Sequence, residues 1–192
     1  MAGPRTWRLA DRCFLRHLPR ADPDRDAARA AVARPQERTM TEELIAFLQH
    51  AVRLESDAAM GYERLAAIMR GRGKTDLTVL FGRFAEFSRL HLTEVRQRLE
   101  AALNGRAEPP VSWQWPDGAT PENPLAALDQ PALDVRGALQ FAAAMERRAC
   151  DYYATIAGQT RSEVVQELAQ QFAEEESEHV SHLQRWIARG PA

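Results

Sequence analysis

The chain has 192 residues, of which 45% are hydrophobic and 27% charged, an ordinary composition for a soluble protein and enough for one domain with a sizeable core. The formal net charge is −2, and no apolar run approaches the roughly 18 residues of a transmembrane helix. Composition therefore gives no case for nucleic acid or membrane as a partner. The two cysteines, Cys13 and Cys150, form no Cys-x-x-Cys pair, which excludes a disulfide framework and a cysteine-rich zinc or rubredoxin site and indicates a reducing, cytoplasmic compartment.

The first 39 residues differ from the rest of the chain. They contain nine arginines against five acidic residues, with four of the 11 prolines, and they lack the apolar region of a secretory signal. Three interpretations stay open: a disordered tail, an arginine-rich docking or targeting arm, or translated upstream sequence with the true start at Met40. We expect an Arg-rich, disordered N-terminal extension over residues 1–39 and a folded domain over residues 40–192.

Four stretches have the apolar periodicity of amphipathic helices. Inward positions recur in alternating steps of three and four residues, as in the helices of a bundle. The helices are predicted at about residues 41–70, 77–103, 134–157 and 161–189. Residues that favour helix ends stand near these bounds. The expected N-caps are Thr41, Asp76 and Asp134, the expected capping box is Thr160 with Glu163, and the expected helix-ending pairs are Asn104-Gly105 and Gly190-Pro191.

Residues 106–133 form an unusually long connection between the second and third helices. Six prolines and the turn residues Asp117-Gly118 rule out a long helix. Only Arg106 is basic here, so Trp113 and Trp115 are expected to pack against the protein and not against nucleic acid. Such a connection suits a crossover along the outside of a bundle. The predicted fold is therefore an all-α, antiparallel four-helix bundle with a long crossover between its second and third helices.

Each inward stripe is apolar except near its middle, where polar residues interrupt it. These positions fall at comparable heights if neighbouring helices run antiparallel. Buried, unpaired carboxylates cost several kcal/mol each, so something has to neutralise three of them at one level of a core. Two divalent cations would do so. The interrupting residues are Glu55 in the first helix, Ser88 and His91 in the second, Glu146 in the third, and Glu176 and His179 in the fourth.

An internal repeat supports this interpretation. The motif Phe-Ala-Glu followed by a histidine occurs at residues 84–91 and again 88 residues later, at 172–179. The second copy contains a Glu-x-x-His motif, whose Glu and His share one helix face and can grip one metal ion. In the first and third helices, the glutamate that interrupts the apolar stripe (Glu55 or Glu146) is followed seven residues later by a tyrosine. The chain therefore reads as a duplicated helix pair, with half a metal site in each copy.

This pattern resembles rubrerythrins and the wider ferritin-like family of carboxylate-bridged diiron proteins, over residues 41–189. The resemblance implies a centre for two iron ions, with manganese or zinc as other candidates. It also implies tyrosines that flank the centre and hydrogen-bond to its carboxylates. The implied metal ligands are Glu55, His91, Glu146, Glu176 and His179, and the implied flanking tyrosines are Tyr62 and Tyr153.

The chain departs from the family pattern at several points. Ser88 stands where the first Glu-x-x-His would have its carboxylate, and Ala149 stands where rubrerythrins have an extra one. Three carboxylates against two ferrous ions leave one positive charge, which makes occupancy of one position doubtful. Glu94, one turn after His91, is the candidate replacement ligand. The chain contains no cysteine-rich rubredoxin module, so the resemblance implies an external electron donor.

The resemblance implies a homodimeric oxidoreductase linked to oxidative stress. It would reduce peroxide or dioxygen, or oxidise ferrous iron, and substrate hydroxylation is a third possibility. The alternative is a degenerate ferritin-like bundle that binds one metal ion or none and serves as a structural or interaction module. Three further residues have no expected role in the site: Cys150 is expected to be a small buried residue, and His50 and His182 are expected at the surface.

Overall fold

The computed structural model describes residues 35–111, 115 and 134–190. Residues 39–192 form a compact unit by themselves. Residues 35–39 of the expected N-terminal extension are helical. The expected disorder of residues 1–34 and the expected packing of Trp113 fall outside the described residues and stay predictions. Within the described ranges, no helix is both long and apolar enough to cross a membrane.

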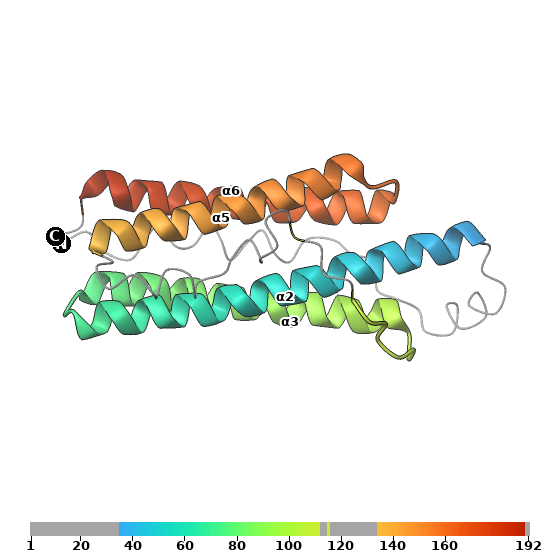
Figure 1. The fold of residues 1–192 in the computed structure, drawn as a ribbon, viewed down its shortest axis with the longest axis horizontal. Helices are drawn as coiled ribbons and strands as arrows, with labels where there is room; N and C mark the ends of the chain where they lie inside the picture. The colour runs from blue at the N-terminus through green and yellow to red at the C-terminus, as the bar shows by residue number, and fades with distance from the viewer. Residues whose placement is uncertain (1–34, 112–114, 116–133, 191–192) are drawn as a thin grey trace. The chain divides into compact units, whose positions relative to one another are not determined.

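The described residues contain four helices, and none of these residues is in a strand. The helices pack as an all-α bundle, which confirms the predicted fold class (Figure 1). Each helix is long enough to bury a continuous apolar stripe against its neighbours. Their bounds are α2, Pro35–Gly71; α3, Thr75–Leu103; α5, Val135–Gln159; and α6, Glu163–Arg189.

Aromatic contacts show which helices are neighbours. Helix α2 lies beside α3 and α5, and α6 also lies beside α3 and α5, so that α3 and α5 are diagonal to each other. Neighbouring helices run antiparallel, whereas α3 and α5 run in the same direction (Figure 1). The ring pairs, with their centroid separations, are Tyr62–Phe84 at 5.0 Å, Phe47–Tyr153 at 6.0 Å, Phe84–His179 at 5.4 Å and Tyr153–Phe172 at 5.2 Å.

The common direction of α3 and α5 confirms the expected crossover. The chain leaves α3 at one end of the bundle and enters α5 at the other, so the connection has to cover the length of the bundle (Figure 1). Its described residues contact α2 and α5. The Trp115 ring lies 5.0 Å from the ring of His50 and 5.3 Å from that of Tyr152. This confirms that Trp115 packs against the protein.

The helix ends match the predictions in part. Asp134 caps α5 by accepting a hydrogen bond from the Gly137 amide at 2.6 Å. Asn104 ends α3 in the left-handed conformation, as expected. In contrast, α2 begins at Pro35, so Thr41 lies inside a helix and is not its N-cap. Proline favours this earlier start because its fixed φ suits a first turn and its missing N–H is not needed there.

Two other caps were wrongly predicted. Lys74 holds the N-cap position of α3 without a side-chain hydrogen bond, and Asp76 lies in the first turn, where it complements the positive end of the helix dipole. Ser162 caps α6 by accepting from the Val165 amide at 3.4 Å. Thr160 instead ends α5 and donates a hydrogen bond to the Glu43 carboxylate of α2. A contact between distant segments therefore displaced the local capping box.

The core is apolar on both sides of a central polar layer. One apolar cluster joins the N-terminal halves of α2 and α6 to the C-terminal halves of α3 and α5, around residues such as Leu48, Leu54 and Phe172. Further buried residues, including Phe81 and Leu139, lie beyond the layer. Buried carboxylates of the layer are thus screened from water along the bundle axis in both directions.

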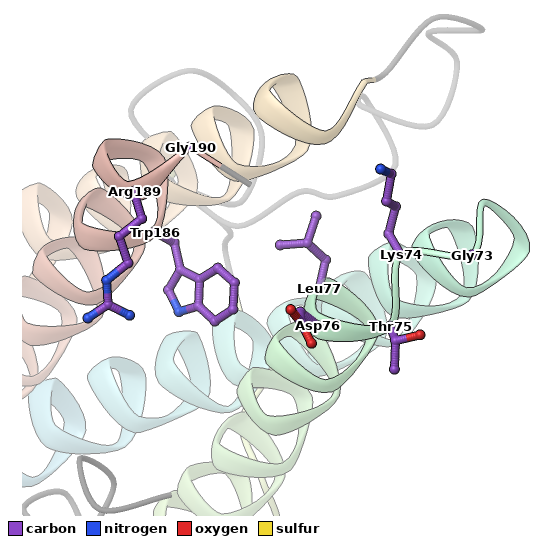
Figure 2. A pocket seen from close by; sticks show the side chains of 8 residues that line it. All are labelled: Gly73, Lys74, Thr75, Asp76, Leu77, Trp186, Arg189 and Gly190. Atoms are coloured by element: carbon purple, nitrogen blue, oxygen red, sulfur yellow. The ribbon is translucent and has the colours of Figure 1, made fainter. Parts of the chain in front are cut away.

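A surface cleft of about 480 Å³ lies at one end of the bundle, where the α2–α3 turn meets the end of α6 (Figure 2). Lys74, Asp76, Trp186 and Arg189 are among the residues that line it. Arg189 follows His179 by ten residues, which is about 15 Å along an α-helix. The cleft is therefore separate from the central polar layer.

Candidate metal centre

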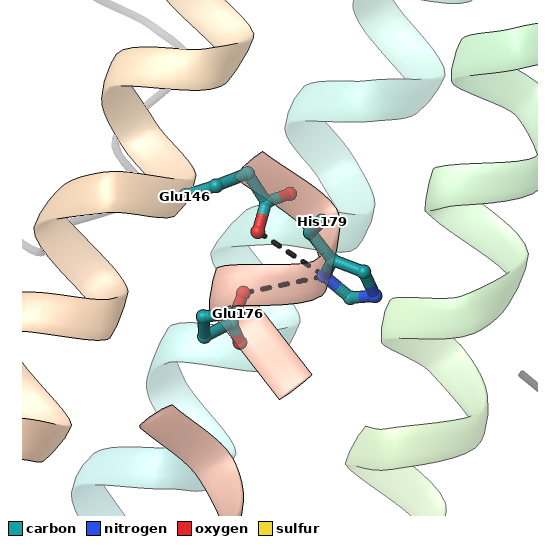
Figure 3. Close-up of side chains that lie close together, drawn as sticks. All are labelled: Glu146, Glu176 and His179. Carbon is teal, nitrogen blue, oxygen red and sulfur yellow. Dashed lines mark hydrogen bonds and ion pairs between the residues drawn. The ribbon is translucent and has the colours of Figure 1, made fainter. Parts of the chain in front are cut away.

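Three polar side chains meet in the middle of the core. Glu146 comes from α5, and Glu176 and His179 come from successive turns of α6 (Figure 3). Nδ1 of His179 lies 3.2 Å from Oε2 of Glu146 and 3.3 Å from Oε2 of Glu176. One potential ligand atom from each residue lies within 4.8 Å of the others. Ligand atoms bound to one ion at about 2.0–2.2 Å have similar separations, so this donor set fits a divalent cation.

Small neighbours on α5 make room for the Glu146 carboxylate. Ala142 precedes it by four residues and Ala149 follows it by three, so both lie on the same helix face. Both alanines are fully buried, and Glu146 itself is only 1% exposed. Larger residues at either position would occupy the space between α5 and the opposing helices. The local sequence therefore leaves a polar gap in an otherwise apolar helix face.

Tyr62 of α2 holds the Glu146 carboxylate from the side opposite His179. Its hydroxyl donates a hydrogen bond to Oε1 of Glu146, while Oε2 faces His179. The Tyr62 ring is itself buried against Phe84, at a centroid distance of 5.0 Å. The predicted hydrogen bond between this tyrosine and a carboxylate of the centre is thus present in the structure.

The protonation states of the three residues depend on one another. Burial lowers the pKa of His179, but the Glu146 charge and the hydrogen bonds that His179 makes to both carboxylates raise that pKa well above its ordinary value. Burial raises the pKa of Glu146, yet the His179 charge and the surrounding hydrogen bonds hold it at about 2. Burial and the charge of Glu146 both raise the pKa of Glu176. Without metal, these shifts favour the protonated forms of His179 and Glu176 and the ionised form of Glu146.

Glu55 and His91 form a second, looser pair in the same layer. Nδ1 of His91 lies 3.5 Å from Oε1 of Glu55, and both side chains are largely buried. Burial lowers the pKa of His91, but the hydrogen bond and the charge of Glu55 outweigh this effect and raise it. The His91 and His179 rings lie 6.0 Å apart and are nearly parallel, with 11° between their planes. The structure thus brings all five expected ligands to one region, three of them in a tight cluster; their binding of metal stays a prediction.

Neither Ser88 nor Glu94 contributes a carboxylate to this layer. The buried Ser88 hydroxyl donates a hydrogen bond to the Phe84 carbonyl at 3.2 Å, one turn back along α3. Glu94 is partly exposed and accepts hydrogen bonds from the Arg98 guanidinium, with its Oε1 3.1 Å from Nε. Binding of metal by Glu94 would require this ion pair to break. The structure therefore disfavours Glu94 as the replacement ligand.

The remaining residues singled out by sequence occupy different environments. The Tyr153 ring is fully buried and packs on Phe172. Cys150 is half-buried, its thiol donates to the Ala173 carbonyl at 3.3 Å, and burial raises its pKa. His182 lies at the surface in part, since it is half-buried. It accepts a hydrogen bond from the Trp186 indole at 3.2 Å, and burial with nearby positive charge lowers its pKa to about 4.

His50 is likewise only partly exposed. It is half-buried, and its ring lies 5.0 Å from that of Trp115 and 6.5 Å from that of Tyr152. Sequence periodicity placed His50 beside the inward stripe of α2, not on it. The crossover residue Trp115 covers it, and this contact depends on the tertiary structure.

One residue near the centre was missed by sequence reasoning. The sequence pattern gave Glu175 no role in the site, but the residue is half-buried and the charges of His91, His179 and Glu55 act on it. Burial raises its pKa. The available signal was its spacing of four residues from His179, which places both on one face of α6.

We expect Tyr62→Phe to weaken metal binding at this cluster by about 10- to 100-fold, the usual effect of losing a hydrogen bond to a metal ligand. The phenylalanine keeps the ring packing against Phe84 and removes only the donor to Glu146. Competition titration with a chromophoric chelator measures the change. Tyr152→Phe is the matched control, because its ring packs on Tyr153 and Trp115 away from the three ligands. Equal affinities of Tyr62→Phe and the unmodified protein would contradict the role of the hydrogen bond.

The fold and this buried carboxylate–histidine layer define a four-helix-bundle protein with a candidate metal centre. No protein-family model and no curated protein matches the chain. Among solved structures, the chain is similar to COG1633, an uncharacterized conserved protein from Magnetospirillum magnetotacticum MS-1. The two share 32% sequence identity with a TM-score of 0.65, over 77% of this chain and 95% of that one. The chain therefore belongs to the COG1633 family.

Proposed function

We propose that this chain is a rubrerythrin-like dinuclear iron protein that reduces peroxide or dioxygen, or oxidises ferrous iron, with an external electron donor. The observation that carries the proposal is the buried cluster of Glu146, Glu176 and His179 beside the pair of Glu55 and His91. Buried charges of this number are costly unless a cation compensates them. A homodimer in the cytoplasm is part of the proposal and rests on the resemblance to rubrerythrins alone.

The two groups of side chains would divide the metal ions between them. Glu146, Glu176 and His179 would hold one ion, and Glu55 and His91 would hold the other. Bound iron would supply two-electron redox chemistry at an open coordination position. The protein's own contribution is positional: Tyr62 orients Glu146, and the apolar core on both sides of the layer excludes water.

The same residues would exchange protons when metal binds. The raised pKa values of His179 and Glu176 favour their protonated forms in the metal-free cluster. A ligand atom has to lose its proton before it can bind a cation. His179 and Glu176 would therefore release protons on loading, and they would be available to accept protons again when metal leaves.

We expect the apparent metal affinity to increase with pH, by about one to two log units per pH unit, since each ion displaces one or two protons. The increase should continue above pH 6.5, the ordinary histidine pKa, because the pKa of His179 is raised. Calorimetric titration with Zn²⁺ in buffers of low and high ionisation enthalpy measures the protons released. An affinity that does not change between pH 6 and pH 8 would show that His179 carries no proton in the metal-free protein.

Metal content per chain tests the proposed function directly. Protein purified without chelator should contain close to two metal ions, mostly iron, when iron, manganese and zinc are quantified together. The anaerobic ferrous protein should then be oxidised by added peroxide in a stoichiometric reaction, followed by visible absorbance. No metal on purification and no uptake of ferrous iron would overturn the proposal.

The alternative function is a structural or interaction module that binds one metal ion or none. Ser88 favours it, because the layer lacks the carboxylate of the first Glu-x-x-His. Within the described ranges, one group alone combines three potential ligands at metal-binding separation. A content of one ion per chain, with no reaction of the ferrous protein with peroxide, would support this alternative.

A further inference from the structure

The Glu55–His91 half of the layer has fewer ligands than the other half. Glu146, Glu176 and His179 form a cluster of three potential ligands, whereas the other half pairs His91 with Glu55, whose Oε1 lies 3.5 Å from Nδ1 of His91. The serine one turn before His91 directs its hydroxyl to its own helix backbone. Glu94, one turn after His91, is held by Arg98. A second carboxylate for this position therefore has to come from another helix.

Glu175 of α6 has the location that this role requires. Helices α3 and α6 run antiparallel, and the Phe84 ring lies 5.4 Å from that of His179 and 6.0 Å from that of His182. His91 follows Phe84 by seven residues on α3, and Glu175 precedes His182 by seven residues on α6. In antiparallel helices these two steps run in the same direction along the bundle and have the same length. Glu175 thus reaches the level of His91.

The direction of the Glu175 side chain is consistent with this level. Adjacent residues of a helix are about 100° apart, so Glu175 and Glu176 face different neighbours. Glu175 precedes His182 by seven residues, which is about two helical turns, so it shares the face of α6 from which His182 contacts Phe84 of α3. Oε1 of Glu175 accepts a hydrogen bond from Gln171 at 3.0 Å.

We propose that Glu175 supplies the carboxylate that Ser88 lacks and completes a metal position with Glu55 and His91. The inference rests on the proposed metal centre and extends it by one ligand. Glu55, Glu146, Glu176 and Glu175 together carry four negative charges, which balance two divalent ions. Three carboxylates would leave the layer with a net positive charge in a medium of low polarity.

The test compares metal binding by Glu175→Gln and by the unmodified protein. Glutamine keeps the size of the side chain and an oxygen that accepts from Gln171, but it has no charge. We use Co²⁺, an air-stable stand-in for ferrous iron, and measure its stoichiometry by calorimetry and its d–d absorbance. Unmodified protein should bind two ions, and Glu175→Gln should bind one tightly while the second binds at least about tenfold more weakly. Glu174→Gln, an exposed neighbour on α6, is the matched control and should still bind two.

A rescue variant separates loss of a ligand from damage to the fold. Adding Ser88→Glu to Glu175→Gln returns a carboxylate to the same metal position from α3, and the second ion should bind tightly again. Failure of the rescue would overturn the inference even if Glu175→Gln alone loses an ion. Thermal unfolding of each variant without metal shows whether the bundle is intact.

The possible results distinguish the inference from the proposed function. Two ions bound with equal affinity by Glu175→Gln and unmodified protein would overturn the inference and leave the proposed function standing. One ion bound by both proteins would overturn the inference and favour the one-metal alternative. No ion bound by either protein would overturn both.

Discussion

Replacing Glu176 with alanine should weaken divalent metal binding at the Glu146–Glu176–His179 cluster by at least about 100-fold, beyond the usual effect of outer-shell changes. Glu176 is 3% exposed, and its Oε2 lies 3.3 Å from Nδ1 of His179. The substitution leaves two of the three ligands and removes a buried carboxylate from the cluster. Metal content after purification, and competition titration with ferrous iron under anaerobic conditions, measure the loss.

Two further variants make this result specific. Glu176→Gln keeps the size of the side chain and a donor to Glu146, so it should keep the fold and still lose the metal. Glu174→Ala changes an exposed residue of the same acidic run and should bind metal normally. Unchanged metal content in Glu176→Ala would show that the cluster is not the binding site.

The second large effect is expected from Ser88→Glu, which should tighten binding of the second metal ion by at least about tenfold. Ser88 is 7% exposed and one turn before His91, so the new carboxylate lies on the same helix face as that histidine. Without metal, the variant should be less stable by about 2 kcal/mol, because a further carboxyl group is buried near Glu55. Bound metal should reverse this loss.

Thermal unfolding with and without Co²⁺ measures both effects in one experiment. Ser88→Gln is the matched control, because glutamine has nearly the volume of glutamate but no charge. It should lose stability through overpacking without gaining metal affinity. If Ser88→Glu and Ser88→Gln bind metal equally, the position has no access to the second ion.

Helix ends show where reasoning from sequence succeeded and where it failed. Asp134 and Asn104 have the predicted roles because each satisfies backbone groups of its own helix. Thr160 has a suitable neighbour in Glu163, yet its hydroxyl donates to Glu43, 117 residues away. A capping box is a local pattern, and a contact with another helix outweighed it.

In the candidate metal centre, too, some features were predictable from the sequence and others were not. Glu55, Glu146 and Glu176 interrupt apolar stripes, and the structure buries all three, because the inward face of a helix follows from its 3.6-residue period. The partners of each carboxylate could not be predicted in this way. Tyr62 and Glu146 are 84 residues apart, and their hydrogen bond depends on how α2 packs against α5.

Four amphipathic helices, the crossover between the second and third of them, and the polar layer in their middle were predictable from local periodicity and from the prolines of the connection. The tight cluster of three ligands and the ion pair of Arg98 with Glu94 were not predictable in this way. The reason is physical: a residue's helix face is set by its own segment, whereas its distance to another side chain is set by helix packing.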